Sequence, residues 1–158
     1  MMQFNEISRD KNAASTELGY VFTFLVGVML LTMFSIWTFG IETATRERWN
    51  IAAVDANLAD IASAVERAND ASRIHPELQY AEAVEWRLTE ADDTAFTIHL
   101  YQDHLKIEHN EPELEREKRL SGSGYAEHSG SLLLDGSGTV WVVYSDGNLT
   151  LSLYRPSF

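Results

Sequence analysis

The stretch that decides the fold is residues 18–41, LGYVFTFLVGVMLLTMFSIWTFGI, which carries no charged side chain between Glu17 and Glu42. As a helix with a rise of about 1.5 Å per residue it is roughly 36 Å long, enough to cross a hydrocarbon core of about 30 Å. Inside lipid, a helix satisfies every backbone polar group within its own segment. The stretch therefore predicts a transmembrane helix, and no other part of the chain has a comparable apolar run.

The rest of the chain is acidic and contains no cysteine. Asp and Glu number 24 against 12 Lys and Arg, which gives a formal net charge of -12. This balance argues against a nucleic-acid partner, whose phosphates need clustered cations, and against docking on anionic lipid headgroups. Without cysteine, thiol catalysis, disulfides and cysteine-type zinc sites are excluded. An acidic, lysine-poor surface is typical of proteins adapted to high salt, and we expect a halophilic protein.

The apolar stretch is expected to remain in the mature protein. It is longer than the core of about 7–15 residues of a secretory signal, and no small-x-small cleavage site follows it before the charges resume. The positive charges on its two flanks do not decide the orientation, because Arg9 and Lys11 are matched by Arg46 and Arg48. We expect the short head, residues 1–17, on the inner side of the cell membrane and the C-terminal domain on the outer side, because only the C-terminal part is long enough to fold.

The head ends in KNAASTE and runs directly into LGYVFTF. Over about residues 9–40 the chain resembles archaeal type IV pilins and pilin-like proteins of the haloarchaeal type. The resemblance implies cleavage by a prepilin peptidase around Lys11, Asn12 and Ala13, although Asn12 stands where the family has Gly or Ala. It also implies that Glu17, in the fifth position after cleavage, neutralises the new amino terminus of a neighbouring subunit. Placing a carboxylate at the start of a membrane helix costs free energy, and a nearby cation reduces this cost.

The segment after the span predicts a continuing amphipathic helix over residues 42–74. It is rich in Ala and lacks Pro and Gly until His75-Pro76 ends the helix. Apolar residues recur at spacings of three and four, as in a heptad stripe: Ile51, Val54, Leu58, Ile61, Val65 and Ala68. Two partners are open for this stripe, namely the chain's own β domain or copies of the same helix in a filament. In the span, Gly19 and Gly27 would permit close helix packing.

Residues 75–158 predict an antiparallel β domain. Apolar and polar residues alternate in six stretches, which start at Val84, Phe96, Leu105, Leu132, Thr139 and Leu149. In the first stretch the apolar positions are Val84, Trp86 and Leu88. Asp146-Gly147 is typical of a tight hairpin turn. The charge run Glu111–Arg119 is expected to be a solvated loop or a short helix. We expect five or six strands in an antiparallel meander, with one face on the stalk helix, which makes an α+β fold.

The sequence offers little chemistry beyond one modification signal. Five histidines invite a metal site, but none of them pairs with another at the i, i+4 spacing of a zinc helix: His75, His99, His104, His109 and His128. There is no phosphate-binding loop and no nucleophile elbow with partners nearby. We therefore expect no enzyme activity, no catalytic residue, no cofactor and no metal site. Asn148-Leu149-Thr150 is an N-glycosylation sequence.

These observations favour a single-span, pilin-like surface protein whose helix anchors it or forms a filament core. Its expected partners are membrane lipid, copies of itself or other pilin-like subunits, and a prepilin peptidase. Two alternatives remain open: a membrane-anchored binding domain that does not polymerise, and an accessory subunit of a membrane or secretion complex. A mature protein that still begins at Met1 would separate these alternatives from the pilin hypothesis.

Overall fold

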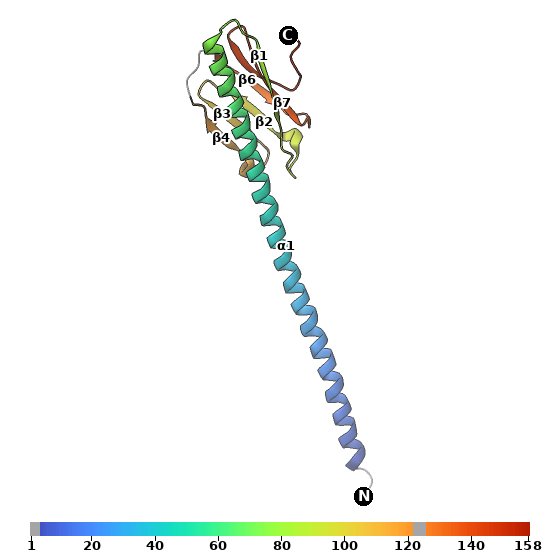
Figure 1. The fold of residues 1–158 in the computed structure, drawn as a ribbon. Helices are drawn as coiled ribbons and strands as arrows, with labels where there is room; N and C mark the ends of the chain where they lie inside the picture. The colour runs from blue at the N-terminus through green and yellow to red at the C-terminus, as the bar shows by residue number, and fades with distance from the viewer. Residues whose placement is uncertain (1–3, 122–125) are drawn as a thin grey trace. The chain divides into compact units, whose positions relative to one another are not determined.

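The computed structural model describes residues 4–121 and 126–158, with side chains from residue 17 onward. In the described ranges, one long helix, α1 (Phe4–Ile74), precedes eight strands and two short 3-10 helices (Figure 1). The last helical hydrogen bond runs from the His75 amide to the Ala71 carbonyl at 3.1 Å. The helix ends there because Pro76 disfavours helical backbone in the residue before it. The predicted α+β fold with a long N-terminal helix is confirmed.

The chain divides into two compact units, Met1–Thr45 and Arg46–Phe158. The second unit contains the C-terminal part of α1 together with all the described strands. Its first sheet has the order β1 (Tyr80–Glu85), β7 (Thr139–Ser145), β8 (Asn148–Ser152) and β5 (Glu127–His128). Its second sheet has the order β4 (Arg116–Arg119), β3 (His104–Glu108), β2 (Thr97–Leu100) and β6 (Gly130–Leu133). Adjacent strands are antiparallel except β5 and β8, which are parallel.

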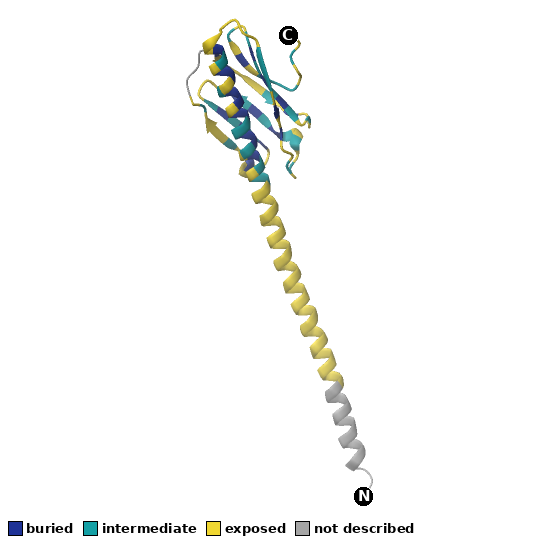
Figure 2. Ribbon diagram, in the orientation of Figure 1, coloured by how far each residue is buried: buried dark blue, intermediate teal, exposed yellow. Residues whose placement is uncertain are grey.

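The heptad stripe of α1 packs against the strands of its own unit. Val54, Ile61 and Val65 are completely buried, and the buried face is visible as the dark side of the helix in Figure 2. The stripe shares one core with Phe96, which precedes β2, and with apolar residues of both sheets: Ile98, Leu100, Leu105, Ile107, Val140, Val142 and Leu149. Each fully buried Leu, Ile or Val contributes about 1.5–3 kcal/mol. Of the two partners that the sequence left open for this stripe, the chain's own β domain therefore occupies it.

The predicted hairpin at Asp146-Gly147 is confirmed. Both residues have a positive φ, 52° and 85°, which is the backbone that a tight turn between antiparallel strands requires. The turn joins β7 to β8, and the two strands pair from Ser145 with Asn148 to Trp141 with Ser152. Burial alternates strictly along β7, so this stretch follows the period of two read from the sequence.

The predicted meander is wrong, because the strands form two sheets rather than one. β1 pairs with β7, which lies far along the chain, and β2 pairs with β3 and β6. Alternation identifies strands and their buried faces, but it contains no information on which strand lies beside which. Long-range pairing is decided by how the two apolar faces close over α1, and this is a property of the whole unit.

The first predicted strand begins and ends earlier than its alternation indicates. β1 covers Tyr80–Glu85, and although Trp86 stays buried, Leu88 is 70% exposed. The early end has its cause in Asn57 on α1, whose side-chain amide donates to the Arg87 carbonyl oxygen at 2.9 Å and accepts from the Arg87 amide at 2.8 Å. The backbone of Arg87 is thus bonded to the helix and is not available to a sheet.

The charge run Glu111–Arg119, expected as a loop or short helix, contains both a 3-10 helix and a strand. The helix, η2 (Pro112–Leu114), places Leu114 in the core, where it is only 2% exposed. The strand β4 (Arg116–Arg119) lies at the edge of the second sheet. Charged side chains are usual on edge strands, where they oppose pairing with another molecule. Composition alone therefore hid this strand.

Candidate functional site

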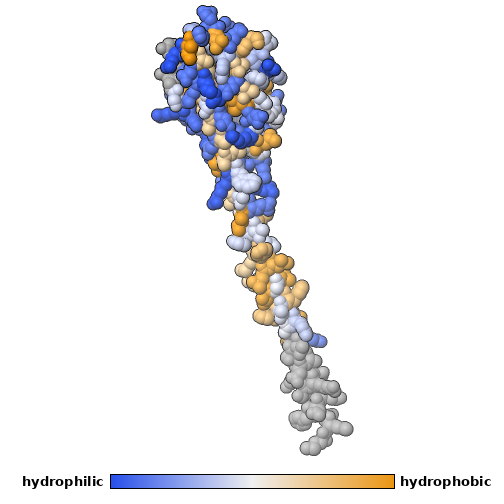
Figure 3. Space-filling view, in the orientation of Figure 1, coloured by the Kyte–Doolittle hydropathy of each residue, from blue (hydrophilic) through white to orange (hydrophobic). Residues whose placement is uncertain are grey.

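The most distinctive surface of the described chain is the apolar part of α1. The segment Leu18–Ile41 is exposed along its whole length, and its most apolar window has a mean hydropathy of 2.1 with none of it buried. Large side chains such as Phe22 and Trp37 are 69% and 64% exposed. Figure 3 shows hydrophobic side chains gathered along this part of the helix. By length and composition, the described chain therefore has one helix that can cross a membrane.

The Ser and Thr hydroxyls within the apolar segment are hydrogen-bonded to the helix itself. The hydroxyls of Thr23, Thr32, Ser35 and Thr38 each donate to the carbonyl oxygen four residues earlier, at 2.9 Å in every case. A hydroxyl bonded in this way has little need of water, so it adds little to the cost of placing the helix in lipid. These four Ser and Thr hydroxyls are therefore compatible with an apolar environment.

The glycines of the segment have no close neighbour within the described residues. A Cβ added at Gly19 or Gly27 would meet no atom within 4 Å, and both have ordinary helical backbone. Glycine costs about 0.8–1 kcal/mol relative to alanine inside a helix. Gly19, Thr23 and Gly27 follow one another at spacings of four, so they lie on one side of α1. This side therefore carries only small side chains at these three positions. These glycines permit close approach of another helix, but the structure itself contains no such helix.

The sequence-predicted processing residues Lys11, Asn12 and Ala13 lie outside the residues whose side chains the structure describes. Glu17 is the first described side chain, and it is exposed. The helical backbone runs through this region without a break.

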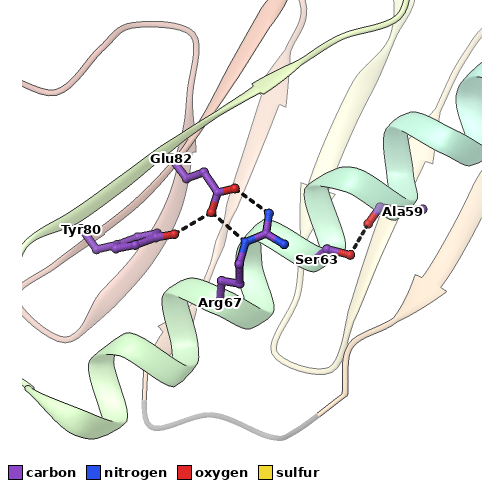
Figure 4. A network of polar contacts seen from close by, with 5 residues as sticks. All are labelled: Ala59, Ser63, Arg67, Tyr80 and Glu82. Atoms are coloured by element: carbon purple, nitrogen blue, oxygen red, sulfur yellow. Dashed lines mark hydrogen bonds and ion pairs between the residues drawn. The ribbon is translucent and has the colours of Figure 1, made fainter.

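A polar network fastens α1 to the first sheet (Figure 4). The Arg67 guanidinium donates to both carboxylate oxygens of Glu82, and the Tyr80 hydroxyl donates to the same carboxylate at 2.6 Å. The hydrogen bond from Arg67 holds the pKa of Glu82 below its usual range, with partial burial opposing this effect. Burial raises the pKa of Tyr80, and the neighbouring carboxylate raises it further. The network positions β1 against the helix.

The buried polar residues of the second unit include one unpartnered imidazole. His128 on β5 is 5% exposed, and neither of its ring nitrogens has a hydrogen-bond partner. Its backbone amide is bonded to the Gln102 side chain, whose own amide donates to the Ala126 carbonyl. Burial lowers the pKa of His128, because the charged form would lose its hydration without gaining a partner. The folded unit therefore favours the neutral form of the His128 imidazole.

The remaining histidines do not assemble a metal centre. In the described residues no group of three His, Asp or Glu side chains lies close enough to hold an ion. His99 lies 3.3 Å from Glu108, whereas His104 contacts Asp103 and stacks on Tyr101 with ring centroids 4.4 Å apart. The carboxylate of Asp135 accepts from the Ser137 amide, as a turn residue does. These contacts account for His99 and His104 within the second sheet and for Asp135 as a turn residue.

An open apolar cleft of about 390 Å³ lies between α1 and the segment after β1. Trp49 and Leu88 are its most exposed large side chains, at 72% and 70%. Asn50 accepts a hydrogen bond from the Glu90 amide, and Arg46 lies 3.5 Å from the Glu90 carboxylate. Sequence analysis missed this cleft because alternation assigned Leu88 to the core. It also missed Asn57, which looks like a solvent-facing position beside Leu58 and has no local signal of its bond to Arg87.

No protein-family model, curated protein sequence or solved structure matches the chain.

Proposed function

We propose that the chain is a single-span, pilin-like surface protein. The segment Leu18–Ile41 lies in the membrane before assembly and in the core of a filament after it, and the strand-rich domain lies outside the cell. One observation carries the proposal: α1 has a C-terminal part whose apolar stripe is buried under its own strands, and an apolar part that nothing in the described chain covers. About 36 Å of uncovered apolar helix requires either lipid or other helices.

The details of the helix support assembly in addition to anchoring. Gly19, Thr23 and Gly27 give one side a small-residue spacing that favours close helix contacts, without any intramolecular reason for glycine. The stripe from Ile51 to Val65 is already occupied by the chain's own core, so copies would contact one another through the apolar segment. Glu17 stands at the start of this segment, where a carboxylate between helices would favour the amino terminus of a neighbour.

The composition supports a high-salt environment. A net charge of -12 with an acidic, lysine-poor surface stays hydrated at high ionic strength, and repulsion between carboxylates is screened there. The absence of cysteine fits an archaeal cell-surface protein as well as an intracellular one, so the orientation rests on the folded C-terminal domain alone.

The first test is the amino-terminal residue of the protein from its native membrane, measured by intact mass and terminal peptide analysis. Pilin-type processing predicts a start near Ala13 with the apolar helix retained. A protein that begins at Met1 would exclude pilin-type processing and leave a membrane-anchored binding domain or an accessory subunit.

Helix-to-helix contact is tested with single cysteines, because the natural chain has none. Gly27→Cys, on the small-residue side, is expected to form disulfide-linked dimers in membranes. Leu25→Cys lies about 160° around the helix from position 27, given about 100° per residue, and is the matched control expected to crosslink less. Equal and negligible crosslinking at both positions would contradict filament assembly and leave the anchoring function.

A further inference from the structure

Asn148-Leu149-Thr150 is the single Asn-x-Ser/Thr sequence of the chain, and the structure presents it at an exposed turn. Asn148 begins β8 directly after the Asp146-Gly147 turn. Leu149 is completely buried, whereas Asn148 and Thr150 are exposed. Side chains alternate across a strand, so the amide and the hydroxyl residue face the same outer side of the first sheet. The two groups that an N-glycosylation enzyme must read are thus on one accessible surface.

The contacts of the Asn148 amide leave room for a substituent. Its Nδ2 donates to the Asp146 carbonyl oxygen at 3.3 Å, a long bond that uses one of the two N–H groups. N-glycosylation replaces only one hydrogen, so the turn contact can persist after modification. The turn itself is held independently by the backbone, because the Glu127 amide donates to the Gly147 carbonyl at 2.9 Å. A glycan here does not require the hairpin to change.

We propose that Asn148 carries an N-linked oligosaccharide. The donor is a lipid-phosphate-linked oligosaccharide: a bond forms between Nδ2 and the sugar C1, and the bond between C1 and the phosphate oxygen breaks. Nδ2 loses one proton, and the lipid phosphate leaves with the electron pair. The proposal rests on the outward orientation of the C-terminal domain given under the proposed function, because the transferase and its lipid-linked donor act on the outer side of the membrane.

The position of the glycan has a structural consequence. Asn148 pairs with Glu127 of β5, the two-residue strand at the edge of the first sheet. Exposed sheet edges can pair with other chains, and a bulky hydrophilic group beside an edge prevents this. The glycan would therefore shield the β5 edge of the first sheet from pairing with another chain.

The test is mass spectrometry of the full chain recovered from its native membrane, with peptides covering residue 148. We expect an added glycan mass on that peptide, complete loss of it in Asn148→Gln and in Thr150→Ala, and its retention in Thr150→Ser. Pro112→Thr provides a second acceptor, because it creates an Asn-Glu-Thr sequence at the exposed residue Asn110. Protease treatment of intact cells reports the orientation separately.

The outcomes distinguish this proposal from the proposed function. Modification of Asn148 with the expected variant pattern supports it. An unmodified Asn148 in a chain whose outer domain is cleaved on intact cells overturns the glycan and leaves the orientation standing, most directly if Asn110 is modified in Pro112→Thr. An unmodified Asn148 in a chain protected from protease overturns the glycan and the outward orientation together.

Discussion

Asn57→Ala is expected to destabilise the second unit although it removes only a polar side chain. Asn57 is completely buried, and its amide makes two hydrogen bonds to the backbone of Arg87, at 2.8 and 2.9 Å. Each bond contributes about 1 kcal/mol net, and the Arg87 amide and carbonyl would be left without these partners. Adding the small cavity left by truncation, we expect a loss of about 2–3 kcal/mol in the free energy of unfolding.

The measurement is urea unfolding of the full chain in non-ionic detergent, followed by near-ultraviolet circular dichroism and by tryptophan fluorescence. Trp86, which is 5% exposed and adjacent to Arg87, reports directly on this region. The matched control is Asn50→Ala, which removes one bond to the Glu90 amide from a less buried position. Its expected loss is at most about 1 kcal/mol.

The variant Asn57→Asp distinguishes the effect of lost hydrogen bonds on stability from the effect of lost side-chain volume. Aspartate has nearly the same shape and keeps an acceptor for the Arg87 amide, but it places an oxygen opposite the Arg87 carbonyl and a charge in a buried position. We expect a loss at least as large as that of Asn57→Ala. The reasoning is refuted if Asn57→Asp is as stable as the natural chain, or if Asn57→Ala costs no more than Asn50→Ala.

Four further outcomes follow from the same contacts. Ile61→Ala should cost about 2–5 kcal/mol in urea unfolding of the second unit, whereas Leu25→Ala, in the uncovered apolar segment, should leave that midpoint unchanged. Because burial lowers the pKa of His128 in the folded state, the unfolded chain binds this proton first as the pH falls below about 6.5. Stability should therefore decrease from there until the folded-state pKa is passed, and unfolding midpoints of His128→Leu across pH 7.5–5 should show a smaller decrease. Glu82→Gln should lower the free energy of unfolding by less than about 1 kcal/mol, because the Arg67 side chain is largely exposed. A larger loss, measured by thermal melting, would mean that this network contributes to stability as much as core packing does. Raising KCl from about 0.1 M to 1 M, which shortens the screening length from about 10 Å to 3 Å, should raise the melting temperature of this acidic chain, and an unchanged melting temperature would contradict adaptation to high salt.

The candidate site was largely readable from the sequence because its signals are local. The apolar run Leu18–Ile41 and the stripe through Ile61 depend on residues a few positions apart on one helix. The Asp146-Gly147 turn is local in the same way, since its positive φ angles follow from the two residues that adopt them. Glu17 and Asn148 were likewise identified from short motifs.

The misplaced end of β1 has a non-local cause. Leu88 continues a perfect alternation, yet the backbone at Arg87 is bonded to Asn57, thirty residues earlier in the chain. No pattern within either segment reports that contact. The edge strand β4 was hidden for a related reason, since its charged residues show the composition of a loop and become a strand only through pairing with β3.

Local patterns in the sequence were enough to show an apolar helix long enough for a membrane, an amphipathic continuation, and a C-terminal domain of strands. Hydropathy, the helical period of 3.6 residues and the strand period of 2 are properties of neighbouring residues, so they can be recognised without a structure. Only the tertiary structure decided that the stripe belongs to the chain's own core, which strands pair, and that the segment Leu18–Ile41 stays uncovered. These depend on which apolar surfaces meet in space, because burial is shared among residues far apart in the chain.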